Sequence, residues 1–274
     1  MYDKAIKIEC YQNMANYKKP ISIQFQETYP LPPYSTVIGM IHKLCDFKNY
    51  NDMYVSIQGI SSSSVAEMYT KYFFGMPFEP YTYKKKDNKY SISTRHNYFV
   101  YRNEGEGIGG TTEYFRKNFE DKTGKGKDGI TKGLGYSELL IDVKLIIHII
   151  PKNQNLLNEI EQKLKKPSIY PSLGRYEDIL RIDFVRCIEL KETTEIELKY
   201  DAYIPISYFN NIINYDMLGM NYKLNKEFDT KSSNSKSRKW KHKTDVKYIK
   251  RSNSTIYFEK PILVDYDNIG VFYA

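Results

Sequence analysis

The sequence has few of the residues on which disulfide-stapled and metal-bound proteins depend. Its 274 residues include 3 cysteines. Cys10, Cys45 and Cys187 lie far apart, which argues against a disulfide framework and for reduced thiols. No C-x-x-C or H-x-x-H pair occurs, and the histidines at 42, 96, 148 and 242 are scattered. Because a structural zinc site needs closely spaced ligands, we expect no metal, and nothing indicates another cofactor.

Long apolar runs are missing as well. No run of 18 apolar residues occurs, which argues against a membrane-spanning helix. The N-terminal sequence MYDKAIKIECYQ alternates like a strand and lacks the charged and apolar regions of a signal peptide. A hydrophobic fraction of 41% excludes intrinsic disorder. We therefore expect a soluble, cytoplasmic protein with its own core and no membrane partner.

Acidic residues are outnumbered by basic ones. The 41 Lys and Arg against 33 Asp and Glu give a formal charge of +8, which favours an anionic partner, with nucleic acid the first candidate. The excess lies in two segments. Residues 82–137 hold 12 basic and 7 acidic side chains, and residues 221–251 hold 11 and 3, which leaves the rest of the chain acidic.

The two basic segments differ in character. In residues 82–137, lysine and arginine alternate with tyrosine, a mixture typical of binding single-stranded RNA through phosphates and stacked bases. A solvated hairpin with anchoring aromatic side chains is the alternative. In residues 221–251, the run KSSNSKSRKWKHK resembles a disordered basic loop, either solvated or in nonspecific contact with a nucleic-acid backbone.

Common catalytic and nucleotide-binding motifs are absent, or their neighbouring residues do not suit the ligand. The run GEGIGG at 105–110 fits G-x-G-x-x-G, but Glu104 and Glu106 would face the pyrophosphate and no apolar helix follows. No G-x-x-x-x-G-K-[ST] exists, which excludes a P-loop ATPase. The absence of G-x-S-x-G and of a clustered acidic pair argues against hydrolase or two-metal nuclease chemistry.

Hydrophobic periodicity predicts two helices among several strands. Alternation predicts strands at 4–12, 54–60, 65–74, 139–150 and 182–190. Helical spacing predicts a helix of about three turns through 37–44, capped by Ser35 or Thr36, and another through 156–166, capped by Asn153 or Asn155. Within the strands we expect Lys7 and His148 to face solvent, and we expect a hairpin through 61–64.

The element order indicates an α+β fold. With residues 82–137 set aside as an insertion, the order strand, helix, strands, strand, helix, strand matches the ferredoxin-like, RRM-like arrangement. We expect this domain to span residues 1–200, followed by a small β-rich C-terminal region at 201–274. RNA-recognition domains use the same scaffold, although a fold alone does not establish a function.

Two segments carry specific motifs. The segment TYPLPPYSTVIGMIHKL, residues 28–44, has the pattern P-x-P-P-x-S-T-x-x-G-hydrophobic and resembles the proline-rich turn and first helix of the CRISPR-associated Cas five family. The segment PSLGRYED, residues 171–178, is similar to the L-G-R motif after the second helix. The likeness spans residues 1–200 and is closest to type I-B.

The resemblance implies a RAMP subunit of a Cascade surveillance complex, without catalytic activity. Such a subunit binds and caps the 5′ handle of the CRISPR RNA, contacts the neighbouring backbone subunit and the large subunit, and meets target DNA through the complex. The insertion at 82–137 would be a thumb-like hairpin. The residues that we expect to contact RNA through N–H groups, close backbone approach or positive charge are Ser35, Thr36, Lys84, Lys85, Lys86, Arg95, Arg102, Arg116, Gly174 and Arg175.

Two other functions stay open. A sibling subtype's member of the family cleaves precursor CRISPR RNA without metal by acid–base catalysis, and Tyr34, Arg95 and His96 loosely resemble its residues. Here Arg95 replaces a lysine, and arginine is too basic to shuttle protons. The third possibility is a general single-stranded RNA-binding module outside any CRISPR complex.

Overall fold

The computed structural model describes residues 3–20, 22, 25–77, 83–86, 89–92, 128–213, 219–228 and 239–274. These form two compact units, one made of residues 1–65 and 138–274 and the other of residues 66–137.

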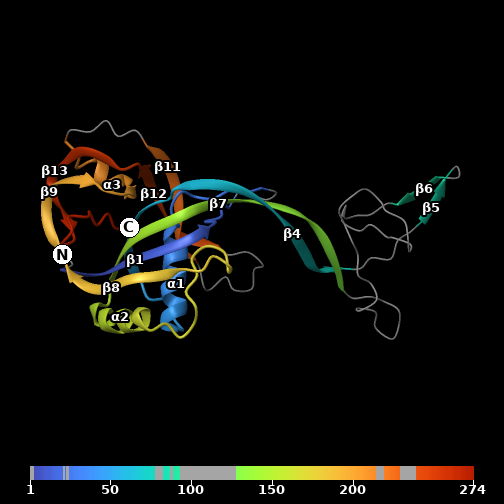
Figure 1. The fold of residues 1–274 in the computed structure, drawn as a ribbon, viewed down its shortest axis with the longest axis horizontal. Coiled ribbons are helices and arrows are strands. Elements are labelled where there is room, and N and C mark those ends of the chain that lie inside the picture. The colour runs from blue at the N-terminus through green and yellow to red at the C-terminus, as the bar shows by residue number, and fades with distance from the viewer. Residues whose placement is uncertain are drawn as a thin grey trace. The chain divides into compact units, whose positions relative to one another are not determined.

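A large antiparallel sheet forms the centre of the fold (Figure 1). Its strand order is β11-β12-β10-β3-β7-β1-β8, and β2 and β4 also pair with β7. Cross-strand pairs such as Ile6 with Ile149 and Ile8 with Ile147 set the register of β1 on β7. The strands are β1 (Lys4–Ala15), β2 (Phe25–Gln26), β3 (Met53–Ile60), β4 (Ser63–Pro77), β7 (Asp128–Pro151), β8 (Arg181–Glu189), β10 (Asp201–Pro205), β11 (Met220–Phe228) and β12 (Trp240–Ile249).

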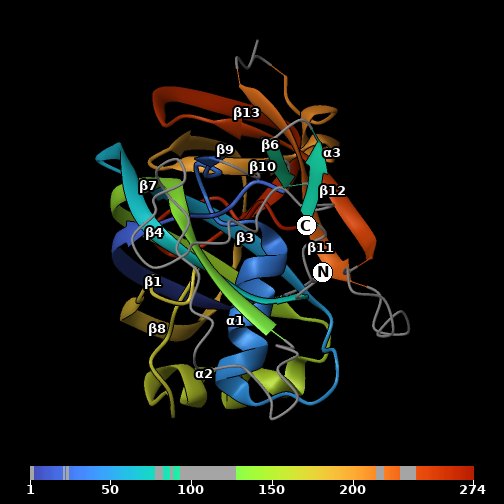
Figure 2. The same cartoon turned by 90° about the vertical axis from the view of Figure 1, so that its right-hand side faces the viewer.

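Two helices cover one face of this sheet (Figures 1 and 2). They are α1 (Tyr34–Cys45) and α2 (Leu157–Lys165), the latter preceded by the 3-10 turn η1 (Gln154–Leu156). Their apolar stripes, including Val37, Ile41 and Ile160, pack with Ile8 and Ile147 of the sheet in one core, which confirms both predicted helices. No helix in the described part of the chain is long and apolar enough to span a membrane.

The helix starts agree with prediction in one case and differ in the other. Asn153 caps η1, because its side chain accepts a hydrogen bond from the N–H of Asn155 at 3.2 Å. The prediction that Ser35 or Thr36 caps α1 is wrong. The N-cap residue is Pro33, whose carbonyl accepts from the N–H of Thr36 at 2.9 Å. Proline, with its fixed φ, starts the helix earlier and places both hydroxyl residues in the first turn.

A second layer covers the opposite face of the sheet (Figure 2). It contains the separate two-stranded sheet of β9 (Lys191–Leu198) and β13 (Ser252–Val264), the short helix α3 (Ile206–Phe209), and the C-terminal segment 265–274. Leu263 and Val271 of this layer pack on Ala5 and Ile150. The central strands β1 and β7 are therefore buried on both faces at these positions.

Burial on both faces overturns two predictions. Lys7 and His148, which alternation placed toward solvent, are both 0% exposed. The Lys7 ammonium lies 2.9 Å and His148 Nε2 lies 3.1 Å from the same oxygen, Oδ2 of Asp265. Alternation reports which side chains share a face but not what covers that face. Here the C-terminal layer supplies a carboxylate that contacts both groups.

The predicted hairpin through 61–64 is also wrong. β3 and β4 both pair with β7 and not with each other, and the N–H of Ser62 donates to the carbonyl of Ile141 at 2.9 Å. β7 is 24 residues long, which gives it enough edge to pair with both strands in succession. In the unit of residues 66–137, a further hairpin joins β5 (Tyr83–Lys86) and β6 (Lys89–Ile92).

Candidate nucleic-acid interface

The proline-rich turn before α1 is held by buried hydrogen bonds. The hydroxyl of Tyr203 donates to the carbonyl of Leu31 at 2.8 Å, and Oγ1 of Thr28 accepts from the N–H of Tyr17 at 2.8 Å. Pro33 is extended, with φ −63° and ψ 153°, and enters the helix directly. Anchored on both sides and stiffened by proline, the turn fixes the position of the first turn of α1.

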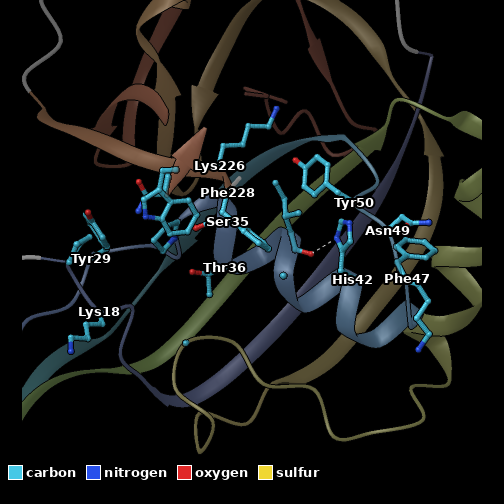
Figure 3. A pocket seen from close by; sticks show the side chains of 18 residues that line it. Lys18, Tyr29, Ser35, Thr36, His42, Phe47, Asn49, Tyr50, Lys226 and Phe228 are labelled. Atoms are coloured by element: carbon cyan, nitrogen blue, oxygen red, sulfur yellow. Dashed lines mark hydrogen bonds between the residues drawn. The ribbon is translucent and has the colours of Figure 1, made fainter. Parts of the chain in front are cut away.

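A cavity of 620 Å³, here called the α1 groove, runs along α1 from its first turn to the loop that follows the helix (Figure 3). Ser35, Thr36, Gly39 and His42 form its helical side. Its described lining contains three lysines and no acidic side chain, so the groove favours an anionic ligand. The remaining lining residues are Lys18, Pro20, Tyr29, Pro33, Ile38, Phe47, Lys48, Asn49, Tyr50, Gly174, Asn225, Lys226, Phe228 and Trp240.

Aromatic rings in the groove are held in fixed positions. His42 stacks on Tyr50, with ring centroids 5.4 Å apart, and meets Phe47 edge to face at 5.5 Å. Its Nδ1 bonds the carbonyl of Ile38 at 2.8 Å, and its Nε2 accepts from the N–H of Asn51 at 2.9 Å, a pairing that suits the neutral ring. Rings held in this way are suited to stacking on unpaired bases.

The second basic segment of the sequence reaches this groove. β11 and β12 bring Lys226, Phe228 and Trp240 to it, and the last two rings meet edge to face at 6.5 Å. The prediction of a disordered loop is wrong for residues 240–243, which belong to β12, while residues 229–238 lie outside the described residues. The sequence signal for these strands is weak, because β11 has one buried residue, Leu224, and β12 has two, Val246 and Ile249, which do not alternate.

Gly39 leaves the floor of the groove open. It is exposed in the middle of α1, and a Cβ added there would have no atom within 4 Å. A glycine in an exposed helix interior costs stability relative to alanine, so packing does not explain it. Its position in the motif and in the groove indicates a need for space.

The L-G-R loop meets the groove only through its glycine. Gly174 lines the groove with φ +108°, and a Cβ there would lie 2.8 Å from the backbone oxygen of Asn16. The Arg175 guanidinium donates to Oδ1 of the buried Asp178 at 2.8 and 3.0 Å, while Oδ2 of Asp178 accepts from the N–H of Asn16. Arg175 thus has a structural partner within the loop, and its contact with RNA stays a prediction.

The other predicted site residues fall elsewhere. Lys84, Lys85 and Lys86 lie in β5, in the unit of residues 66–137, where Lys84 pairs with Ser91. Arg95, His96, Arg102 and Arg116 lie outside the described residues. The groove therefore brings together Ser35, Thr36 and Gly174 of the predicted set. Sequence reasoning missed Lys18, Gly39, Tyr50 and Lys226 as members of the site.

Tyr34, a candidate acid–base residue, is part of the core. It is 0% exposed, packs 6.4 Å from the ring of Tyr203, and has no hydrogen-bond partner for its hydroxyl among the described residues. Burial raises the pKa of the Tyr34 hydroxyl far above its usual range. A proton-transfer role needs a group that reaches the substrate, and this position is unfavourable for it. No group of metal-ligating side chains lies together in the part of the chain that the structure describes.

Comparison with known proteins gives one family and several distant structures. A family model for CRISPR-associated Cas5 proteins matches residues 5–256. No curated protein matches the chain. A CRISPR RNA-guided surveillance complex contains a similar chain, with 13% identity, a TM-score of 0.45, and coverage of 97% of this chain and 92% of that one. A CRISPR protein from Archaeoglobus fulgidus is similar at 10% identity and a TM-score of 0.45, with coverage of 98% of this chain and 97% of that one. A chain of the type III-B Cmr-beta complex bound to target RNA and AMPPnP is similar at 8% identity and a TM-score of 0.36, with coverage of 93% of this chain and 86% of that one.

Proposed function

Because the chain belongs to the CRISPR-associated Cas5 family, we propose that it is a non-catalytic RNA-binding subunit of a CRISPR surveillance complex. In this role it binds and caps the 5′ handle of the CRISPR RNA in the cytoplasm. It contacts the neighbouring backbone subunit and the large subunit, and it meets target DNA through the complex. The observation that carries the proposal is the α1 groove, where cations, rings and a helix start surround one cavity.

The fold supports a ferredoxin-like RAMP domain for this subunit. The strand order β8-β1-β7-β3, with α1 between β1 and β3 and α2 between β7 and β8, is the order expected for that arrangement. Within this proposal, residues 82–137 form the thumb-like hairpin, and Lys84, Lys85 and Lys86 contribute RNA contacts there together with Arg95, Arg102 and Arg116.

In the α1 groove, each kind of lining residue has a part in holding RNA. The hydroxyls in the first turn of α1, at Ser35 and Thr36, donate to a phosphate, aided by the helix dipole. Lys18 and Lys48 add positive charge, and Trp240 offers a ring for an unpaired base. Gly39 gives the strand room to approach the helix.

The salt dependence of RNA affinity separates the contribution of charged side chains from that of base stacking. Lys18→Ala with Lys48→Ala is expected to weaken binding of a handle RNA and to reduce the slope of log affinity against log salt by about 1.4, because each lost phosphate contact removes about 0.7 for a single strand. Trp240→Ala is expected to weaken binding about tenfold with the slope unchanged, because stacking contributes about 1–3 kcal/mol per base. Fluorescence anisotropy in a salt series measures both.

The matched control for this test is Lys191→Ala with Lys260→Ala. Both lysines are exposed, and they lie on β9 and β13 of the separate sheet. An equal loss of slope in this control would contradict the assignment of the groove. Equal affinity for unrelated oligonucleotides would favour the general RNA-binding module. Cleavage of repeat RNA in EDTA to a cyclic phosphate would favour the endoribonuclease, for which the buried Tyr34 is poorly placed.

Gly39 provides a test in which stability and binding change in opposite directions. Gly39→Ala is expected to raise the free energy of unfolding by about 0.5–1 kcal/mol, because alanine suits an exposed helix interior and meets no atom there. Gly39→Leu is expected to weaken RNA binding about tenfold, equivalent to about 1.4 kcal/mol, by filling the groove floor. Urea unfolding and anisotropy measure the two effects. A leucine variant that binds RNA like the wild type would show that the groove floor is not used.

A further inference from the structure

A second cavity lies beside the α1 groove and shares two residues with it. This cavity of 550 Å³, here called the Lys226 pocket, is lined by Tyr50, Asp52, Lys152, Lys226, Glu227, Lys241 and His242. Tyr50 and Lys226 also line the α1 groove. In Figure 3 both side chains lie at the same end of the groove, with the Tyr50 ring beside His42. A ligand in the groove that extends past these two side chains enters the pocket.

Lys226 carries a positive charge that its surroundings do not neutralise. Lys152 pairs with Asp52 at 2.5 Å and Lys241 pairs with Glu227 at 2.9 Å. Lys226 has no carboxylate at ion-pair distance among the residues that the structure describes, and its ammonium instead lies 4.8 Å from the centre of the Tyr54 ring.

A second cation, Lys152, repels the Lys226 ammonium. Lys152 approaches the same Tyr54 ring at 5.5 Å. Burial lowers the pKa of Lys226, and the charge of Lys152 lowers it further, against the opposing effect of Asp52. An anion bound between the two lysines would offset both effects, because the two carboxylates of the pocket, Asp52 and Glu227, already pair with Lys152 and Lys241.

The hydroxyl of Tyr50 points to a ligand independently. It is a buried polar atom with no hydrogen-bond partner among the described residues. Burial, with smaller effects from Asp52 and Glu227, raises the pKa of Tyr50 to about 12, so the hydroxyl keeps its proton and can donate. A buried donor left unpaired costs free energy, and most buried polar groups in proteins have a partner, so an unpaired hydroxyl in the lining of a cavity indicates a ligand there.

We propose that the Lys226 pocket binds a phosphate group, with the Lys226 ammonium and the Tyr50 hydroxyl as its two inner donors. Lysine binds phosphate as a point charge, and the hydroxyl adds a directed hydrogen bond. Lys241, held by Glu227 at 2.9 Å, adds a donor at the rim. The inference rests on the proposed function: the phosphate belongs to the same RNA strand whose base stacks in the α1 groove.

Two conservative substitutions test the two inner donors in the full-length protein. Tyr50→Phe keeps the stack on His42 and removes only the hydroxyl, and it is expected to weaken binding of a handle RNA about fivefold. Lys226→Met keeps the length of the side chain and is expected to reduce the salt slope by about 0.7. Both variants are expected to melt near the wild-type temperature, because Tyr50→Phe removes a buried hydroxyl without a partner among the described residues and Lys226→Met removes a charge that burial disfavours. Weaker binding without lower stability is a result that a purely structural role would not give.

Matched controls lie far from the pocket. Tyr170→Phe removes the hydroxyl of a side chain that is 88% exposed, and Lys191→Met removes an exposed cation on β9. Both are expected to bind RNA like the wild type. If Tyr50→Phe and Lys226→Met also bind like the wild type, with equal slopes, the phosphate site is overturned while the proposed function stands.

A titration with inorganic phosphate and with adenosine monophosphate, followed by calorimetry, separates the possible sources of the phosphate. If the wild type fails to bind RNA but binds adenosine monophosphate in a manner that Tyr50→Phe and Lys226→Met abolish, the proposed function fails and the pocket is a site for a small phosphate compound. If the wild type binds neither RNA nor the phosphate compounds, both proposals are overturned.

Discussion

Asp265→Ala is expected to lower the free energy of unfolding by about 3–5 kcal/mol, the usual cost of breaking a buried charge pair. Oδ2 of Asp265 contacts the Lys7 ammonium and His148 Nε2, and its Oδ1 accepts from the N–H groups of Asp267 and Ile269 at 2.9 and 2.8 Å. Alanine would leave all four groups without this partner inside the protein. Urea denaturation at neutral pH measures the loss.

The electrostatics of this cluster agree with that expectation. Burial alone would raise the pKa of Asp265, but His148 and Lys7 hold it well below its usual range. Burial alone would lower the pKa of Lys7, but Asp267, Asp265 and Glu9 raise it. The two groups therefore remain charged in the folded protein and depend on each other, so removing one leaves the other uncompensated.

Asp267→Ala is the control for Asp265→Ala. Asp267 also contacts the Lys7 ammonium, at 2.5 Å, but its side chain is 47% exposed. Water can replace it, and Asp265 and Glu9 remain beside Lys7, so its loss is expected to cost about 1 kcal/mol or less. Similar losses in the two variants would contradict the assignment of Asp265 as the centre of the cluster.

Gly174→Ala is expected to destabilise the protein by about 2–4 kcal/mol, in the range of strained backbone and local clash. The φ of +108° is unfavourable for any residue with a Cβ, and that atom would lie 2.8 Å from the oxygen of Asn16 and from Oδ2 of Asp178. The same loop is joined to β1 by Gln12, whose amide donates to the carbonyls of Leu173 and Asp178. Urea denaturation gives the change in stability.

The matched control for Gly174→Ala is Gly39→Ala. The chemical change is identical, but a Cβ at Gly39 meets no atom and lies within a helix, so the sign of the stability change is expected to reverse. A loss below about 0.5 kcal/mol for Gly174→Ala would show that the loop tolerates a Cβ, and that its glycine serves RNA approach and not the fold.

Local pattern predicted both helices and the strands β1, β3, β4, β7 and β8, but not β11 and β12, and it did not predict how the elements are covered. The spacing of Val37, Met40, Ile41 and Leu44 predicted α1, because a helix buries one stripe against a sheet. The same reasoning failed at Lys7. Its burial depends on Asp265, more than 250 residues away in the chain, and no local periodicity carries that information.

Of the candidate site, only the residues that belong to a sequence motif were predicted. Ser35, Thr36 and Gly174 belong to recognisable segments, and the structure brings them to one groove. Lys226 belongs to a segment that composition alone makes similar to a solvated loop. Its role follows from the pairing of β11 with β12, which sets Lys226 and Trp240 beside α1. Strand pairing of this kind is a tertiary property that charge counts do not report.

The wall shared by the two cavities makes their ligands interdependent. Tyr50 and Lys226 face both the α1 groove and the Lys226 pocket, so whatever fills one space alters the position or the protonation of groups that the other space uses. Thermodynamic linkage makes this influence mutual: a base in the groove changes the affinity for a phosphate in the pocket by the same factor as the reverse. A strand of RNA that occupies both is therefore recognised as a unit, and its two halves supplied separately would reveal the coupling.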